Sequence, residues 1–178
     1  MKKITDMIVD ERIKNKQDIH LKRFTARAII LKDDQILMAY SKKFDDYMTP
    51  GGGIEDEPIE QALIREVEEE MGLIIHNIRP IGYIEELRLT ENGLNLYQKS
   101  HYFFSDIEKI GNKRLETYEA NFGLEAVWVN IKEVIRQNEY IIDKRRKTPI
   151  TGVHPFSTLK RENAILKHVL KEHLHEKI

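Results

Sequence analysis

The sequence predicts an α/β fold in which a mixed β-sheet lies between helices, as an α/β/α sandwich. Segments rich in β-forming residues occur on both sides of one strongly amphipathic segment, Ile59 to Met71. A second amphipathic segment, Leu159 to Leu174, closes the chain. Runs of strands interrupted by one helix and closed by another are compatible with this architecture. The 178 residues are enough to bury a core without disulfides.

Five segments are predicted to be strands. Thr25 to Leu31 and Gln35 to Ser41 flank the turn residues 32–34, so we expect them to pair as a hairpin. Ile78 to Leu87 and Leu94 to Phe104 form a second pair, joined near Glu91-Asn92-Gly93. A short strand is expected at Glu125 to Val129.

The segment Ile59 to Met71 is predicted to be a helix. Pro58 suits the first helical position, where its missing N–H would be unbonded in any case. Ile59, Leu63, Val67 and Met71 recur every four residues and make an apolar stripe. Gly72 stands where a C-terminal cap is expected.

The remaining segments give weaker predictions. Residues 1–22 are polar and are expected to form an extension or a short helix ahead of one domain at 23–178. Residues 106–123 are predicted to be a loop, and Ile131 to Arg136 to open a short helix. Residues 143–157 hold the basic run 144–147, which is typical of a solvated face.

Composition excludes several classes of protein. There are 29 Lys and Arg against 30 Asp and Glu, so a nucleic-acid-coating protein is not indicated. The chain has no cysteine, which excludes a disulfide scaffold, a zinc-thiolate site and a cysteine nucleophile. No histidine pair has zinc spacing, so no zinc is expected. No apolar run approaches the ~20 residues of a membrane span and no signal peptide is visible, so we expect a cytoplasmic protein.

Three glutamates of the first predicted helix mark a site. Glu66, Glu69 and Glu70 lie at i, i+3 and i+4, so they share one helix face. Like charges at this spacing destabilise a helix, unless a cation compensates them. Mg²⁺ binds carboxylate oxygens together with substrate phosphates. The glycines of Gly51–Gly53 permit close approach of the backbone to a phosphate or a metal. A solvated acidic helix face is the alternative.

The segment 51–73, GGGIEDEPIEQALIREVEEEMGL, resembles the Nudix box, G-x5-E-x7-R-E-U-x-E-E-x-G-U with U aliphatic. Every defined position is filled, by Gly51, Glu57, Arg65, Glu66, Val67, Glu69, Glu70, Gly72 and Leu73. A chance match is roughly one in 10⁷ at average composition. Because glycine is tripled, Gly51 and Gly52 are both candidates for the first box glycine.

The resemblance implies a MutT-like Nudix fold and a hydrolase. Members of the family cleave the pyrophosphate bond of a nucleoside diphosphate linked to another group X, with Mg²⁺ or Mn²⁺ assisting the attack of water. Glu69 and Glu70 are the implied metal ligands, and Glu66 a third ligand or the base that activates water. Arg65 would orient a glutamate. Glu57 would support the site or bind a further metal.

The resemblance also implies contributions from outside the helix. A carbonyl of Gly51 or Gly52 would complete the metal's shell, and Gly51, Gly52 and Gly53 would contact the substrate. In this family a later carboxylate often joins the site, and the candidates are Glu116, Glu119 and, preferred, Glu125. A surface carboxylate is an equal reading of Glu125. His154 is a weaker candidate for substrate binding, since a lone loop histidine is usually a surface residue.

Family cues for hydrolases of NADH, ADP-ribose, dinucleotide polyphosphates and coenzyme A are absent. The remaining substrates are a nucleoside triphosphate, an oxidised dNTP or a nucleotide sugar. Two alternatives to an enzyme stay open: a catalytically inactive nucleotide-binding or sensor module, and an interaction protein with an acidic helix. Because many relatives are dimers, a homodimer is an assembly to test.

Overall fold

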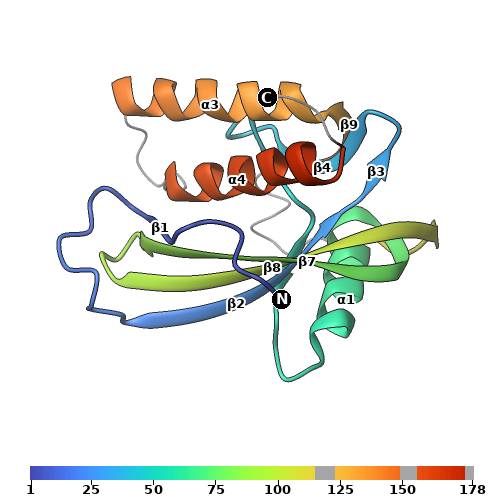
Figure 1. The fold of residues 1–178 in the computed structure, drawn as a ribbon, viewed down its shortest axis with the longest axis horizontal. Coiled ribbons are helices and arrows are strands. Elements are labelled where there is room, and N and C mark those ends of the chain that lie inside the picture. Colours follow the sequence, from blue (N-terminus) through green and yellow to red (C-terminus); the bar gives the residue numbers. More distant parts are fainter. Residues whose placement is uncertain (115–122, 149–155, 175–178) are drawn as a thin grey trace.

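Two β-sheets form the middle of the molecule in the computed structural model, which describes residues 1–114, 123–148 and 156–174 (Figure 1). The larger sheet has the order β1 (Ile8–Val9), β7 (Leu73–Leu89), β8 (Asn95–Ile110), β2 (Leu21–Ile29) and β6 (Gly51–Gly53). The smaller sheet contains β3 (Leu31–Lys32), β4 (Gln35–Ser41), β5 (Asp46–Met48) and, beside β4, β9 (Leu124–Asn130). β2 runs parallel to β8 and antiparallel to β6, so the predicted mixed sheet is confirmed.

Helices cover both faces of the larger sheet. α1 (Ile59–Met71) lies on one side, and α3 (Ile131–Lys147) and α4 (Phe156–Glu172) stack on the other (Figure 1). Successive residues of β2 point to opposite faces, so Ala28 packs in the cluster under α1 and Ile29 in the cluster under α4. The α/β/α arrangement predicted from the sequence is confirmed. No helix within the described ranges has the length and apolar character needed to cross a membrane.

The box helix has the predicted bounds, Ile59–Met71. Leu63, Val67 and Met71 are buried in the core, as the apolar stripe predicted. Gly72 ends the helix with φ 70°, in the left-handed conformation that glycine adopts at low cost. Pro58 has ψ 141° and therefore stands one position earlier than predicted, at the cap and outside the first turn.

Several predicted elements are longer in the structure, and β8 and α3 differ most from their predicted ends. β8 continues to Ile110, so the loop expected at 106–123 was wrong for 106–110, where β7 supplies backbone partners as far as Leu73. α3 runs on to Lys147, because Ile141 and Ile142 give its second half a buried face. Within the basic run, Arg145 is buried against Asp46 at 2.7 Å, which the solvated-face interpretation missed. α4 begins at Phe156, three residues before its predicted start, and ends at Glu172, two residues before its predicted end.

The predicted first hairpin is divided between the two sheets. β2 ends at Ile29, and the turn with Asp33 at φ 54° joins β3 to β4, with Leu31 opposite Ile36. The N-terminal residues also join the fold, because β1 pairs in parallel with β7 (Ile8 opposite Glu86). Within the segment 1–22, β1 forms an edge strand of the larger sheet, and no α-helix is present.

Candidate metal centre

The backbone that leads into the glycines is held from several sides. The N–H and hydroxyl of Thr49 both donate to one carboxylate oxygen of Glu162, at 2.9 and 2.8 Å. Arg27 donates to the Thr49 carbonyl at 2.8 Å, and the Ala28 N–H donates to the Pro50 carbonyl at 2.8 Å. Residues from β2 and α4 thus position the segment that carries Gly51.

The first two glycines have different reasons to lack a side chain. Gly51 has φ 124°, and an added Cβ would come within 2.2 Å of the Ala26 carbonyl oxygen. Its N–H donates to a Glu70 carboxylate oxygen at 2.8 Å. An added Cβ on Gly52 would lie 2.0 Å from a carboxylate oxygen of Glu66. Gly51 therefore permits the turn of the chain, and Gly52 makes room for a glutamate of α1.

Arg65 connects the charged residues of the box. Its guanidinium donates to Glu57 at 2.6 Å, to Glu66 at 2.9 Å and to Glu69 at 3.1 Å. It also donates to the Gly53 carbonyl at 3.1 Å. The structure thus brings together five predicted site residues, from the segment before α1 and from two turns of α1.

The charges of this cluster do not balance. The carboxylates of Glu57, Glu66 and Glu69 all accept hydrogen bonds from the guanidinium of Arg65. A fourth box carboxylate, that of Glu70, accepts from the Gly51 N–H. Hydrogen bonds from Arg65 lower the pKa of Glu57. Burial raises the pKa of Glu66, although Arg65 and, less strongly, Arg27 oppose the shift. An additional cation would therefore be stabilised here.

The donor set fits a hard divalent cation, since it consists of carboxylate and carbonyl oxygens. The carboxylates are turned to Arg65 and to the Gly51 N–H, and among the described residues no three His, Asp or Glu side chains are already arranged to hold a metal ion. A bound ion would have to draw Glu66 and Glu69 away from Arg65.

Other predicted residues lie elsewhere. Glu125, on β9, has a half-exposed side chain that pairs with Lys42 at 2.6 Å, and its role stays a prediction. His154, Glu116 and Glu119 lie outside the described residues.

Several residues near the cluster were not predicted. The Arg114 N–H donates to the Glu69 carbonyl at 2.7 Å, which places the residues that follow β8 against α1. A hollow of about 230 Å³ lies there, lined by Arg65, Glu68, Glu69, Asn112 and Arg114. The other missed residues are Arg27 and Glu162, which hold Thr49. Glu162 lies between the apolar positions Leu159 and Ile165 of α4, and this placement was the one sequence feature that could have indicated a buried glutamate.

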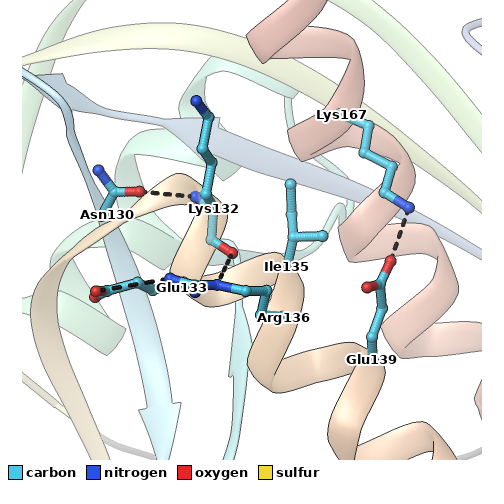
Figure 2. A pocket seen from close by; sticks show the side chains of 7 residues that line it. All are labelled: Asn130, Lys132, Glu133, Ile135, Arg136, Glu139 and Lys167. Atoms are coloured by element: carbon cyan, nitrogen blue, oxygen red, sulfur yellow. Dashed lines mark hydrogen bonds and ion pairs between the residues drawn. The ribbon is translucent and has the colours of Figure 1, made fainter. Parts of the chain in front are cut away.

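A larger hollow, about 560 Å³, lies between α3 and α4 (Figure 2). Its lining contains no box residue, and its charged groups bind one another. Lys167 pairs with Glu139 at 2.8 Å, and Arg136 pairs with Glu133 at 3.9 Å. The box cluster is therefore the stronger candidate site despite its smaller hollow.

Comparisons with known proteins show the family and the fold of the chain. Residues 21–149 match the model of the NUDIX domain family. A NUDIX hydrolase from Nitrosomonas europaea superposes with a TM-score of 0.52 at 21% identity, covering 76% of this chain and 98% of that one. A UDP-X diphosphatase superposes with a TM-score of 0.55 at 16% identity, covering 90% of this chain and 68% of that one. No curated protein sequence matches the chain.

At these identities the superpositions show a common fold, while the family match spans most of the chain. Fold and family together define a hydrolase of phosphoric anhydrides. The chain belongs to the NUDIX family of pyrophosphohydrolases, which act on nucleoside diphosphate derivatives, as the box resemblance predicted.

Proposed function

We propose that the chain hydrolyses the pyrophosphate bond of a nucleoside diphosphate linked to X in a reaction that depends on Mg²⁺ or Mn²⁺. The observation that carries this proposal is the convergence of Glu57, Glu66 and Glu69 on Arg65, with Glu70 bonded to Gly51. Nucleoside triphosphates, oxidised dNTPs and nucleotide sugars are the proposed substrates. The UDP-X diphosphatase among the structural neighbours is a reason to include UDP-linked compounds.

Glu66, Glu69 and Glu70, with a carbonyl of Gly51 or Gly52, would hold the ion, and Glu57 could hold a further one. When bound, the ion would neutralise charge on the pyrophosphate and make water a better nucleophile. Arg65 keeps the carboxylates close to one another while the ion is absent. Glu66, packed against Gly52, is the proposed acceptor of the proton from the attacking water.

A hydrolysis screen with Mg²⁺ and with Mn²⁺ tests this proposal, with products separated by chromatography. We expect turnover of one substrate class and a loss of at least 100-fold in Glu69→Gln. Glu60→Gln, an exposed change in the first turn of the same helix, is the matched control and should keep wild-type turnover. Near-wild-type turnover by a folded Glu69→Gln variant would overturn the assignment.

Thermal unfolding separates the two alternatives. A sensor module would be stabilised by nucleotide, by about 2.7 kcal/mol at 100 times Kd, without forming product. An interaction protein with an acidic helix would show no change of Tm between Mg²⁺ and EDTA. We expect Mg²⁺ to raise the Tm of the wild type and to have less effect on Glu69→Gln.

The division into 1–22 and 23–178 and the homodimer remain predictions. Truncation before residue 23 and sedimentation of the full chain would test them.

A further inference from the structure

The connection between β5 and β6 consists of Thr49 and Pro50 and leads directly into Gly51. Pro50 has no N–H, so Thr49 carries the single backbone donor of this connection. Thr49 is fully buried, and a buried backbone N–H requires an acceptor. Its acceptor is a side chain and not a neighbouring strand. The position of Gly51 therefore depends on what Thr49 contacts.

The acceptor for Thr49 is a carboxylate of a distant helix, α4. One oxygen of Glu162 accepts both the N–H and the hydroxyl of Thr49, at 2.9 and 2.8 Å. The other oxygen accepts from Arg161 at 2.7 Å. Glu162 is fully buried, and a buried carboxylate is costly unless it is paired and hydrogen-bonded. Arg161 supplies this pairing and is itself held by Glu86 of β7 at 2.8 Å.

A neutral acceptor would satisfy the Thr49 N–H without a buried charge. Hydrogen bonds to a charged group are about twice as strong as those between neutral groups, so a carboxylate holds its donors more firmly. The Thr49 carbonyl is also held by a charged group, because Arg27 donates to it at 2.8 Å. An anion and a cation thus fix the two backbone polar groups of one residue. Such restraint is useful where the next residues must keep their place beside several carboxylates.

Gly51 carries this restraint to the box. Its N–H donates to Glu70 at 2.8 Å, and the Ala28 N–H of β2 donates to the Pro50 carbonyl at 2.8 Å. Glu70 is itself a proposed metal ligand, so its bond to Gly51 competes with a bound ion. The bonds at Thr49 and Pro50 do not compete with an ion, and they are the permanent support of the glycine.

We propose that Glu162 is a positioning residue of the metal centre, which acts through Thr49 on Gly51 and has Arg161 as its counter-ion. By this path α4 holds the glycine backbone against the box carboxylates, so that a carbonyl and the carboxylates are available to one divalent cation. The inference rests on the metal-dependent function proposed above.

Deletion of one hydroxyl tests this path with little change of shape. Thr49→Val removes the hydroxyl that donates to Glu162, and Thr49→Ser keeps it. Ser157→Ala is the matched control, because Ser157 of α4 is also buried and its hydroxyl donates to the other carboxylate of the network, Glu86, at 2.7 Å. Glu162→Gln is the stronger change, since its amide NH2 would face a donor, either Arg161 or Thr49.

Hydrogen exchange of the Gly51 amide in EDTA measures the positioning without a metal. We expect exchange at least tenfold faster in Thr49→Val than in the wild type, because the bond from Gly51 to Glu70 loses its support. The rate is divided by that of the Val67 amide within α1, so that a change of global stability cancels. Thr49→Ser and Ser157→Ala should stay within threefold of the wild type. Equal protection of Gly51 in Thr49→Val and the wild type would overturn the inference.

Binding of Mn²⁺, followed by the electron paramagnetic resonance signal of the free ion, connects the positioning to the metal. Thr49→Val should raise the Kd for Mn²⁺ at least fivefold, and Glu162→Gln at least tenfold. Thr49→Ser and Ser157→Ala should stay within twofold, which a merely structural role of the network would not predict.

The outcomes separate this inference from the proposed function. If the wild type binds Mn²⁺ and both Thr49→Val and Glu162→Gln bind it equally well, the positioning role is refuted and the proposed function stands. If the wild type binds no Mn²⁺, the metal-dependent function itself fails, and the inference fails with it.

Discussion

At the scale of single residues, the candidate centre depends on the missing side chain of Gly52. The Glu66 carboxylate occupies the space into which any Cβ at this position would project, with 2.0 Å between the two atoms. The φ of Gly52 is not in the left-handed region, so its backbone conformation is open to other residues. The requirement for glycine is therefore one of space beside a functional carboxylate.

Gly52→Ala should accordingly displace Glu66 and lower turnover at least tenfold, with a loss of stability of about 1–2 kcal/mol. Gly53→Ala is the matched control, because its Cβ would meet nothing closer than the Arg23 guanidinium at 3.9 Å. Steady-state kinetics and urea unfolding of both variants make the comparison. Equal activity of the two variants would show that the position of Glu66 does not matter.

At the scale of elements, the end of α1 shows how a glycine combines two requirements. Gly72 has φ 70°, and a Cβ there would lie 3.1 Å from the Cβ of Lys113. Gly93, in the turn between β7 and β8, has φ 75° and nothing within 4 Å of its would-be Cβ. At both positions a side chain would be strained by the left-handed backbone, but only Gly72 is also crowded.

Gly93→Ala should therefore cost about 1 kcal/mol, from the left-handed conformation alone. Gly72→Ala should cost more, because the segment carrying Lys113 must also shift. Urea denaturation of the two variants measures the difference. A smaller loss for Gly72→Ala would contradict the role assigned to the contact with Lys113.

The edge strand β1 is fastened by Asp10. Its carboxylate accepts from the backbone N–H of Arg12 at 3.0 Å, from the Arg12 guanidinium at 2.6 Å and from the Leu89 N–H at 3.4 Å. Burial pushes the pKa of Asp10 upward, but these hydrogen bonds outweigh it and the pKa is lowered. A carboxyl with a lowered pKa stabilises the fold when it is ionised.

Asp10→Asn should therefore lose about 1–2 kcal/mol of stability at pH 7. The stabilisation is complete above the ordinary pKa of 3.8 and is lost as the pH falls through the lower value of the folded state. The difference between wild type and variant should shrink as the pH is lowered below 3.8. Urea unfolding between pH 7 and the acid range measures this difference in stability, with the exposed Asp18→Asn as control.

At the scale of the whole molecule, one buried network joins α4, the sheet and the box. Arg161 bonds to Glu86 on β7, and Glu162 bonds to Thr49 ahead of Gly51. The side chain of the next residue, Asn163, donates to the Ile135 carbonyl of α3 at 3.2 Å. Three consecutive residues of α4 thus reach three different parts of the fold.

Arg161→Met should cost about 3 kcal/mol or more, because it leaves two buried carboxylates without their common partner. The double variant with Glu86→Gln should regain part of this loss. Arg79→Met, at an exposed arginine of β7, should change stability by less than about 0.5 kcal/mol. A loss for Arg161→Met as small as that of Arg79→Met would show that the network is not stabilising.

Local spacing was sufficient to predict α1, the common face of its glutamates and its C-terminal cap at Gly72. Each of these depends on contacts between residues at most four positions apart, or on the conformation of one residue. The Nudix box also concentrates eight of the predicted site residues in one segment, so the proposed chemistry could be recognised without tertiary contacts. The order of β-rich segments and helices was compatible with an α/β architecture, and the resemblance to Nudix proteins, not periodicity, implied its topology.

The remaining features arise from pairing between distant residues. The bond of Glu162 to Thr49 spans 113 positions, and that of Arg161 to Glu86 spans 75. Polar residues such as Asp106 and Lys109 became strand because β7 offered backbone partners. The periodicity of apolar residues predicts which residues are buried, but it does not predict which distant residues they contact. Those contacts form only when the sheets and helices pack together.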